Sequence, residues 1–226
     1  MKISSIAGSL RRFAPGRIVL LSACLLGSAC SSLLPEKEAP ANLYSLDYLP
    51  VVSQIRGGSE GDARSGAIVI VTPPRAAPGF DRPRMVYLRE PHHLEYFARN
   101  QWVEAPQRML APLLIAALEN SGRFRSILQA PSAAAGEVRL STEILGLQQE
   151  FFGSPSQVRF TLRASLIDEA TRKVMATRTF EAVVDAPGDN PYGGVQAANQ
   201  AVNQVLRQVA AFCSEQVDRV MAPAGK

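Results

Sequence analysis

The sequence predicts a single α/β (α+β) domain in which two main helices pack on one face of a mixed, mostly antiparallel sheet. Three patterns lead to this prediction: a long hairpin of alternating residues, a long amphipathic helix near the C-terminal end and a shorter helix in the middle of the chain. The 226 residues are 46% hydrophobic and 19% charged, which argues against a disordered protein and provides enough apolar material for one core.

The first half of the chain predicts several short strands. Leu43–Tyr48 alternates in polarity, and Ala67–Thr72 is a continuous β-branched run, typical of a strand buried on both faces. Between them, the glycine-rich range 51–66 predicts a surface loop. Met85–Leu88 and Leu94–Phe97 predict two further strands.

A helix is predicted for Glu104–Asn120, because its apolar residues recur on one face. Pro106 suits the first turn of this helix, whereas Pro112 is expected to kink it. Phe124–Gln129 then predicts a short strand, which a loop follows.

The second half predicts longer strands. Glu137–Leu147 is expected to be a strand with a bulge near Gly146, where its apolar phase slips. The ranges 158–166 and 174–184 alternate between apolar and polar residues, with a break at Arg178. They therefore predict an antiparallel hairpin with one face in water.

A long helix is predicted for the C-terminal region. Its apolar stripe, with spacings of three and four, is Val195, Ala198, Val202, Val205, Val209 and Phe212. Its other face is expected to carry Asn199, Gln200, Asn203, Gln204, Arg207 and Gln208. Cys213 lies on the apolar stripe and is expected to be a small buried hydrophobic residue without a disulfide partner.

The N-terminal segment predicts an export signal. Residues 1–29 contain four basic residues and no acidic one, so they hold the whole formal charge of +4, and residues 30–226 are neutral. The basic residues are Lys2, Arg11, Arg12 and Arg17. A neutral mature chain argues against nucleic-acid binding. The apolar run at 18–29 is too short to span a membrane but suits a signal peptide.

Small residues before a cysteine resemble a bacterial lipobox. Leu26-Gly27-Ser28-Ala29 precedes Cys30, which makes Cys30 the predicted lipid-attachment site. The expected division is then a signal peptide at 1–29, a lipidated tether at 30–41 and a domain at 42–222. Ser31, where inner-membrane retention is associated with Asp, favours an outer-membrane lipoprotein facing the periplasm.

Cys24 is the alternative attachment site. Leu21-Ser22-Ala23 before it fits the usual lipobox pattern better, but only about six apolar residues then follow Arg17. An ordinary signal with two incidental cysteines is a third reading.

Few residues suggest catalysis or a cofactor. His92 and His93 are adjacent, and neighbouring side chains of an extended segment point to opposite faces, so solvated loop histidines are favoured over a metal site. The sequence contains no P-loop, nucleophile elbow or H-E-x-x-H motif. The carboxylates weighed as an acid and base pair, and interpreted as solvated strand or turn residues, are Glu143, Glu150, Asp168 and Glu181.

The range 80–106 carries the most specific motifs. Phe80-Asp81-Arg82-Pro83-Arg84-Met85-Val86 is an Asp-Arg-Pro element followed by an apolar strand, and Trp102 lies shortly before the helix led by Pro106. Together with Leu43-Tyr44-Ser45-Leu46, these motifs resemble the auxiliary lipoprotein components of ABC-type transport systems, the family that includes paraquat-inducible protein C.

The resemblance covers nearly all of residues 30–221. The helix leucines and Asn120 also fit the family pattern, whereas Arg84 stands where glutamine is commoner and Pro106 comes one place later than usual.

This resemblance implies a non-enzymatic outer-membrane lipoprotein of a system that moves lipids between the inner and outer membranes. The implied partners are a substrate-binding protein with a mammalian-cell-entry (MCE) domain, an ABC permease and an ATPase, with no cofactor of its own. Two other classes stay open: a structural lipoprotein partner of an outer-membrane assembly barrel, and a lipoprotein hydrolase. The neutral charge and amide-rich last helix also suggest a homo-oligomer.

The aromatic segment from Phe80 to Trp102 is a second candidate site. Phe80, Tyr87, Tyr96 and Trp102 are expected to contact a partner or lipid, because short broken elements can cover only part of this apolar area. The alternative is that these residues cover the core beneath the first helix.

Overall fold

The computed structural model describes residues 40–47 and 66–221, which all belong to the second of two units, Pro40–Lys226. Four expected features lie outside the described residues: Cys24, Cys30, the tether up to residue 39 and the loop at 51–65. Within the described ranges, no helix combines the length and the hydropathy that crossing a membrane requires.

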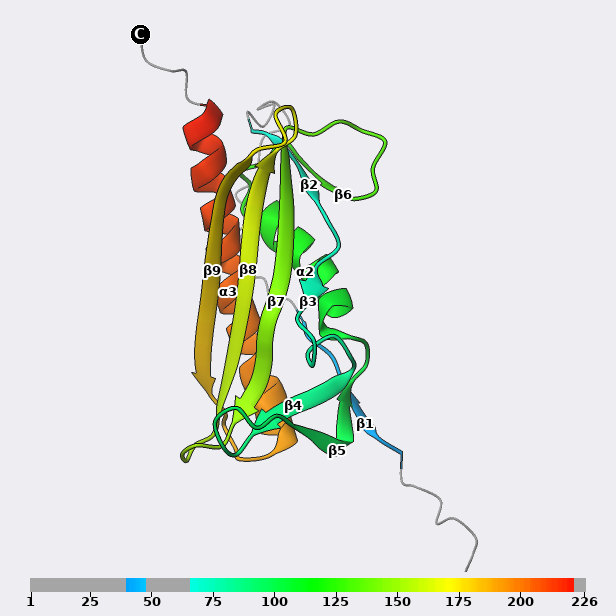
Figure 1. Cartoon of the computed structure of the whole chain (residues 1–226), viewed down its shortest axis with the longest axis vertical. Coiled ribbons are helices and arrows are strands. Elements are labelled where there is room, and N and C mark those ends of the chain that lie inside the picture. Colours follow the sequence, from blue (N-terminus) through cyan, green and yellow to red (C-terminus); the bar gives the residue numbers. More distant parts are fainter. Residues whose placement is uncertain (1–39, 48–65, 222–226) are drawn as a thin grey trace, which may run out of the picture. The chain divides into compact units, whose positions relative to one another are not determined.

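Three long antiparallel strands form one part of the sheet: β7 (Val138–Glu150), β8 (Gln157–Asp168) and β9 (Val174–Asp185) (Figure 1). The predicted hairpin is β8–β9, and the predicted bulge is the register shift between Ile144 and Gly146 in β7. Both predictions are confirmed. Buried and more exposed residues alternate along β8, so one face meets the core and the other meets water.

Six short strands complete the sheet: β1 (Asn42–Tyr44), β2 (Ile68–Val71), β3 (Arg75–Ala76), β4 (Arg84–Leu88), β5 (Glu95–Trp102) and β6 (Ser126–Gln129). β7 pairs with β8 along one edge and, in parallel, with β2, β3 and β4 in succession along the other. β5 is antiparallel to β4 and parallel to β1.

The sheet is mixed, as predicted. Among the described strands, five of the eight pairs are parallel, but the two longest ladders, β7–β8 and β8–β9, are antiparallel. β3 was not expected, because it has only two residues and lies directly after Pro73-Pro74.

Two helices cover one face of the sheet: α2 (Pro106–Asn120) and α3 (Pro191–Met221) (Figure 1). α2 begins two residues later than predicted and continues through Pro112, which is exposed. Asn190 caps α3, because its Oδ1 accepts a hydrogen bond from the Gly193 N–H at 2.9 Å.

The apolar stripe predicted for the last helix is buried at all six of its positions. α3 buries a wider face than this stripe, including Ala197, Ala201 and Leu206, because it packs on α2 as well as on β8 and β9. Cys213 lies in the same core as a free thiol. Arg178, which breaks the alternation of β9, is exposed and holds its Cζ 4.8 Å from the ring centroid of Phe212.

Two amides expected on the outer face of this helix bind the chain after β1 instead. Asn203 is only 4% exposed, and its Nδ2 donates to the carbonyl oxygen of Asp47 at 2.9 Å. The Oδ1 of Asn199 accepts from the Asp47 N–H at 2.6 Å. The prediction was therefore wrong at these two positions. The segment after β1 lies against this part of the helix, and its backbone groups take the two amides as hydrogen-bond partners.

Candidate functional site

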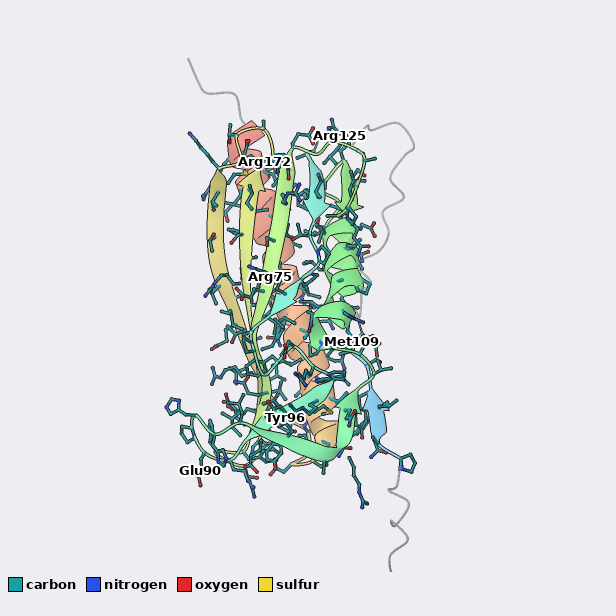
Figure 2. The ribbon with its side chains drawn as sticks, turned by 45° about the vertical axis from the view of Figure 1, so that its right-hand side comes forward. Arg75, Glu90, Tyr96, Met109, Arg125 and Arg172 are labelled. Carbon is teal, nitrogen blue, oxygen red and sulfur yellow. The ribbon has the colours of Figure 1, made fainter. Side chains whose placement is uncertain are left out.

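The Pro40–Met221 domain has two ends that differ in chemistry. The β1 end consists of β1, β4, β5, the turn at 151–156 and the start of α3, and lies lower in Figure 1. The opposite end consists of the starts of β2 and β7, the turn between β8 and β9 and the end of α3. In Figure 2, Glu90 and Tyr96 lie at the β1 end, whereas Arg125 and Arg172 lie at the opposite end.

A cluster of three aromatic rings lies at the β1 end. The ring centroid of Tyr87 is 4.5 Å from that of Phe97 and 5.9 Å from that of Phe151, which it meets edge-on. A hydrogen bond of 2.8 Å from the Phe151 N–H to the Leu88 carbonyl extends the β4–β7 pairing to this point. All three rings are half-buried, so the cluster is partly open to solvent.

Two donors hold Glu95 beside this cluster. The Tyr87 hydroxyl donates to Oε2 of Glu95 at 2.9 Å, and Nε of Arg89 donates to Oε1 at 2.8 Å. Arg89 also reaches Oε2, and this bidentate contact is the main reason that the pKa of Glu95 is lowered to about 2. The hydrogen bond to Glu95 raises the pKa of Tyr87. An ionised Glu95 therefore joins the start of β5 to β4.

The four aromatic residues predicted as contacts are not equivalent. Trp102 is 4% exposed and lies in the core, so it offers almost no surface to a partner. This agrees with the alternative expectation, in which the segment covers the core. Phe80, Tyr87 and Tyr96 are half-buried. Arg84 holds its Cζ 3.9 Å from the ring centroid of Tyr96. For these three residues a contact role stays a prediction.

Five large apolar residues are exposed at this end, and all but Leu94 lie outside the segment that the sequence predicts as a contact surface. They are Leu43 (62% exposed), Leu94 (39%), Val103 (56%), Phe152 (52%) and Tyr192 (58%). Val103 donates its N–H to the Tyr44 carbonyl at 2.7 Å, and the Tyr192 ring lies 6.3 Å from the Tyr44 ring, so both flank β1. The pair Phe151-Phe152 directly before Gly153-Ser154-Pro155 could have indicated this surface. Turn formation does not require aromatic side chains, so two of them in a turn favour a contact role.

Ion pairs cover much of the opposite end. They are Arg123–Asp218, Arg125–Glu137, Arg139–Glu169, Arg172–Glu169 and Arg219–Glu215. Arg139 contributes most to lowering the pKa of Glu169, through its hydrogen bond. Val174, 62% exposed, is the large apolar side chain that is exposed at this end within the described residues.

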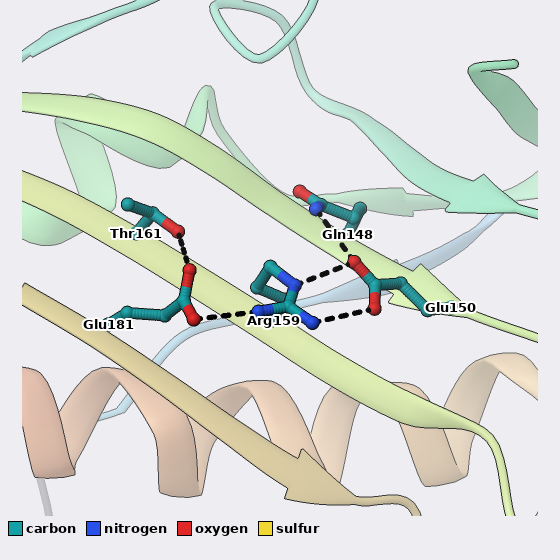
Figure 3. A network of polar contacts seen from close by, with 5 residues as sticks. All are labelled: Gln148, Glu150, Arg159, Thr161 and Glu181. Atoms are coloured by element: carbon teal, nitrogen blue, oxygen red, sulfur yellow. Dashed lines mark hydrogen bonds and ion pairs between the residues drawn. The ribbon is translucent and has the colours of Figure 1, made fainter. Parts of the chain in front are cut away.

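Arginines form ion pairs with the sheet carboxylates that the sequence offered as candidate catalytic groups. In Figure 3, Arg159 joins Glu150 and Glu181: its Nε lies 2.8 Å from Glu150 Oε1, and its Nη1 lies 2.7 Å from Glu181 Oε1. Gln148 donates to Glu150 and Thr161 to Glu181. The network therefore holds β7, β8 and β9 together across the solvent-facing side of the sheet.

The other two candidate carboxylates are also engaged. Glu143 pairs with Arg163 at 3.3 Å across β7 and β8. Asp168 accepts a hydrogen bond of 2.6 Å from the Thr171 N–H in the turn before β9, and this bond lowers the pKa of Asp168. These carboxylates serve strand pairing and turn formation.

Both histidines lie between β4 and β5 and are exposed, and His92 has a positive φ of 67°. Within residues 40–47 and 66–221, no group of three His, Cys, Asp or Glu side chains is placed to hold a metal ion. A hollow of about 720 Å³ lies between the end of α2 and α3, and the Arg123–Asp218 pair belongs to its lining.

A family model supplies the identification. The model described as ABC-type transport auxiliary lipoprotein component matches residues 44–210, from β1 into α3. The chain belongs to this family. The resemblance inferred from the sequence motifs is thereby confirmed, and the chain is a member of a lipoprotein family that serves ABC transport. No curated protein matches the sequence.

Solved structures share the fold of this family member. Protein XCC0632 from Xanthomonas campestris, of family DUF330, is 18% identical with a TM-score of 0.64, over 81% of this chain and 97% of that one. A second structure, described only as an uncharacterized protein, is 15% identical with a TM-score of 0.59, over 77% of this chain and 99% of that one. Both likenesses show a common fold.

Proposed function

We propose that this chain is a non-enzymatic auxiliary component of an ABC-type system that moves lipids between the inner and outer membranes. It is anchored by a lipid on Cys30 in the outer membrane and faces the periplasm. The family match over residues 44–210 carries this proposal, because the family consists of lipoprotein components of ABC transport. The signal segment and the small residues before Cys30 add support.

The lipid anchor would be a strong one. Lipobox processing gives a diacylglyceryl thioether and an N-acyl chain on the same cysteine, and two membrane signals already suffice for stable anchoring. The domain then acts as a docking surface close to the membrane. Its sheet carboxylates support a structural role, because arginines and backbone donors hold them in the fold.

The partners in this proposal are an MCE protein, an ABC permease and an ATPase. ATP hydrolysis falls to the ATPase in this proposal, and residues 1–226 contain no P-loop motif. The contribution of this chain is to anchor and position the outer-membrane side of the transport path.

Replacing the predicted lipid-bearing cysteine tests the anchor. We expect Cys30→Ser to abolish acylation, measured by intact mass, and to release the protein into the soluble periplasmic fraction. Cys24→Ser is the matched control and should remain lipidated. The reverse pattern would move the attachment site to Cys24.

Copurification tests the partners. A tagged full-length chain, extracted in mild detergent, is expected to bring down an MCE protein together with a permease and an ATPase. Recovery of an outer-membrane assembly barrel instead would favour the structural alternative, and labelling by a serine-reactive probe would favour a hydrolase.

The predicted homo-oligomer is tested by the mass of the purified protein in solution. A strictly monomeric mass would contradict this prediction.

A further inference from the structure

Exposed apolar side chains gather where the described chain begins. Of the seven large hydrophobic residues exposed among the described ones, five lie at the β1 end, and the other two, Val174 and Val183, lie on β9. Phe152 occupies the turn between β7 and β8, Leu94 the connection between β4 and β5, and Tyr192 the first turn of α3. Three different elements therefore present apolar side chains at one end.

The length of the tether limits which end can lie near the membrane. β1 begins at Asn42, twelve residues after Cys30. Twelve residues reach at most about 40 Å even when fully extended. The 31 residues of α3 extend over about 45 Å. A lipid on Cys30 therefore keeps β1 close to the bilayer.

Contacts inside the domain fix β1 near the start of α3. Asp47 binds Asn199, which lies eight residues after Pro191 and hence about 12 Å along the helix. The chain that leaves the membrane thus joins the domain at the end that carries Phe152, Leu94 and Tyr192.

We propose that the β1 end lies on the surface of the bilayer that holds the lipid anchor, with Phe152, Leu94 and Tyr192 in the headgroup region. The inference rests on the proposed anchor at Cys30 and adds an orientation and a second membrane contact. Tyrosine suits this position, because it is apolar along the ring and polar at its tip. The ion-paired opposite end then remains in water.

Charge is expected to add less to this contact than apolar area does. Residues 79–104, which contain β4 and β5, hold four arginines and four acidic residues and are therefore neutral. An anionic lipid would add little attraction to a neutral segment. The contact is accordingly expected on zwitterionic vesicles as well.

Nitroxide labels on the lipidated protein test the proposal. Phe152→Cys and Leu94→Cys place a label at the β1 end, and Val174→Cys is the matched control, an exposed apolar position at the opposite end. Cys213 should not react, because burial raises the pKa of its thiol to about 12. The protein is reconstituted in phosphatidylcholine vesicles, and collisions of each label with oxygen and with a water-soluble nickel chelate are measured.

We expect the ratio of oxygen to nickel collisions to rise several-fold on vesicles for the labels at 152 and 94, and to stay at its aqueous value for 174. Aqueous ratios at all three positions would overturn the proposal, and so would a loss of both kinds of collision at 152 and 94, which indicates burial against protein. Intact mass tests the anchor separately. An anchor at Cys24 would lengthen the tether by six residues and leave Cys30 as a free thiol, so in that case Cys30 is replaced by serine before labelling.

Discussion

The β1 end and the opposite end of the domain differ in the kind of side chain that they expose to solvent. At the opposite end, five ion pairs join charged side chains, and Val174 is the large apolar residue that is exposed within the described part of the chain. At the β1 end, five large apolar residues are exposed around a half-buried aromatic cluster. The opposite end thus exposes mainly charged side chains, whereas the β1 end also exposes apolar area that folding does not use.

The difference teaches that the aromatic segment has two roles. Its C-terminal residue, Trp102, is core, whereas Tyr87 and Tyr96 lie at the boundary between core and solvent. The exposed residues next to them, Leu94 and Phe152, have no role in the core. Surface that contributes nothing to folding is where a membrane or a partner can bind.

Replacing one buried and one exposed aromatic residue should give the largest difference in the free energy of unfolding. Trp102→Ala removes a buried indole and should lower the free energy of unfolding by about 3–5 kcal/mol. Phe152→Ala, at a 52% exposed position, should change it by less than about 0.5 kcal/mol. Urea unfolding of both variants in the unlipidated Cys30→Ser background measures this. Equal losses would contradict the assignment of Trp102 to the core and of Phe152 to the surface.

Replacing one arginine near each end should give a smaller difference in the free energy of unfolding. Arg159→Ala leaves the Glu150 carboxylate, whose side chain is 8% exposed, without a cation, and should cost about 2–3 kcal/mol of unfolding free energy. Arg125→Ala breaks an exposed pair at the opposite end and should cost about 0–1 kcal/mol, less in high salt. The same unfolding measurement decides, and a larger cost for Arg125 would contradict the account of the ion-paired end.

Acid should weaken the β1 end through Glu95. Because the folded state lowers the pKa of Glu95 to about 2 from 4.5, its contribution to stability is complete above about pH 4.5 and is lost as the pH falls towards 2. Unfolding measured from pH 6 to pH 2 should therefore show a smaller difference between Glu95 and Glu95→Gln proteins as the pH falls. A difference that is constant over this range would mean that Arg89 does not hold the carboxylate.

Local sequence patterns were sufficient for the elements with many consecutive, regularly placed residues. The hairpin of β8 and β9, the bulge near Gly146 and the buried stripe of α3 all follow from side-chain periodicity, which one segment carries alone. The motifs around Trp102 likewise pointed to a family, and the match over residues 44–210 confirmed that family.

Features that depend on distant segments could not be read in this way. The aromatic cluster joins Tyr87 and Phe97 to Phe151, more than fifty residues later, through the parallel pairing of β4 with β7. Asn203 looked like a surface amide, but it satisfies backbone groups after β1, some 150 residues earlier. Neither contact leaves a periodic signal in its own segment.

The height of each end above the membrane tests the central claim most directly. A donor dye on Phe152→Cys or on Lys173→Cys of the lipidated protein is measured by energy transfer to acceptor lipids in vesicles. Our account predicts strong transfer from position 152 and much weaker transfer from position 173, because the 12 residues of β8 separate the two turns by about 40 Å. Equal transfer from both positions, or stronger transfer from 173, would contradict a domain that rests on the membrane by its β1 end.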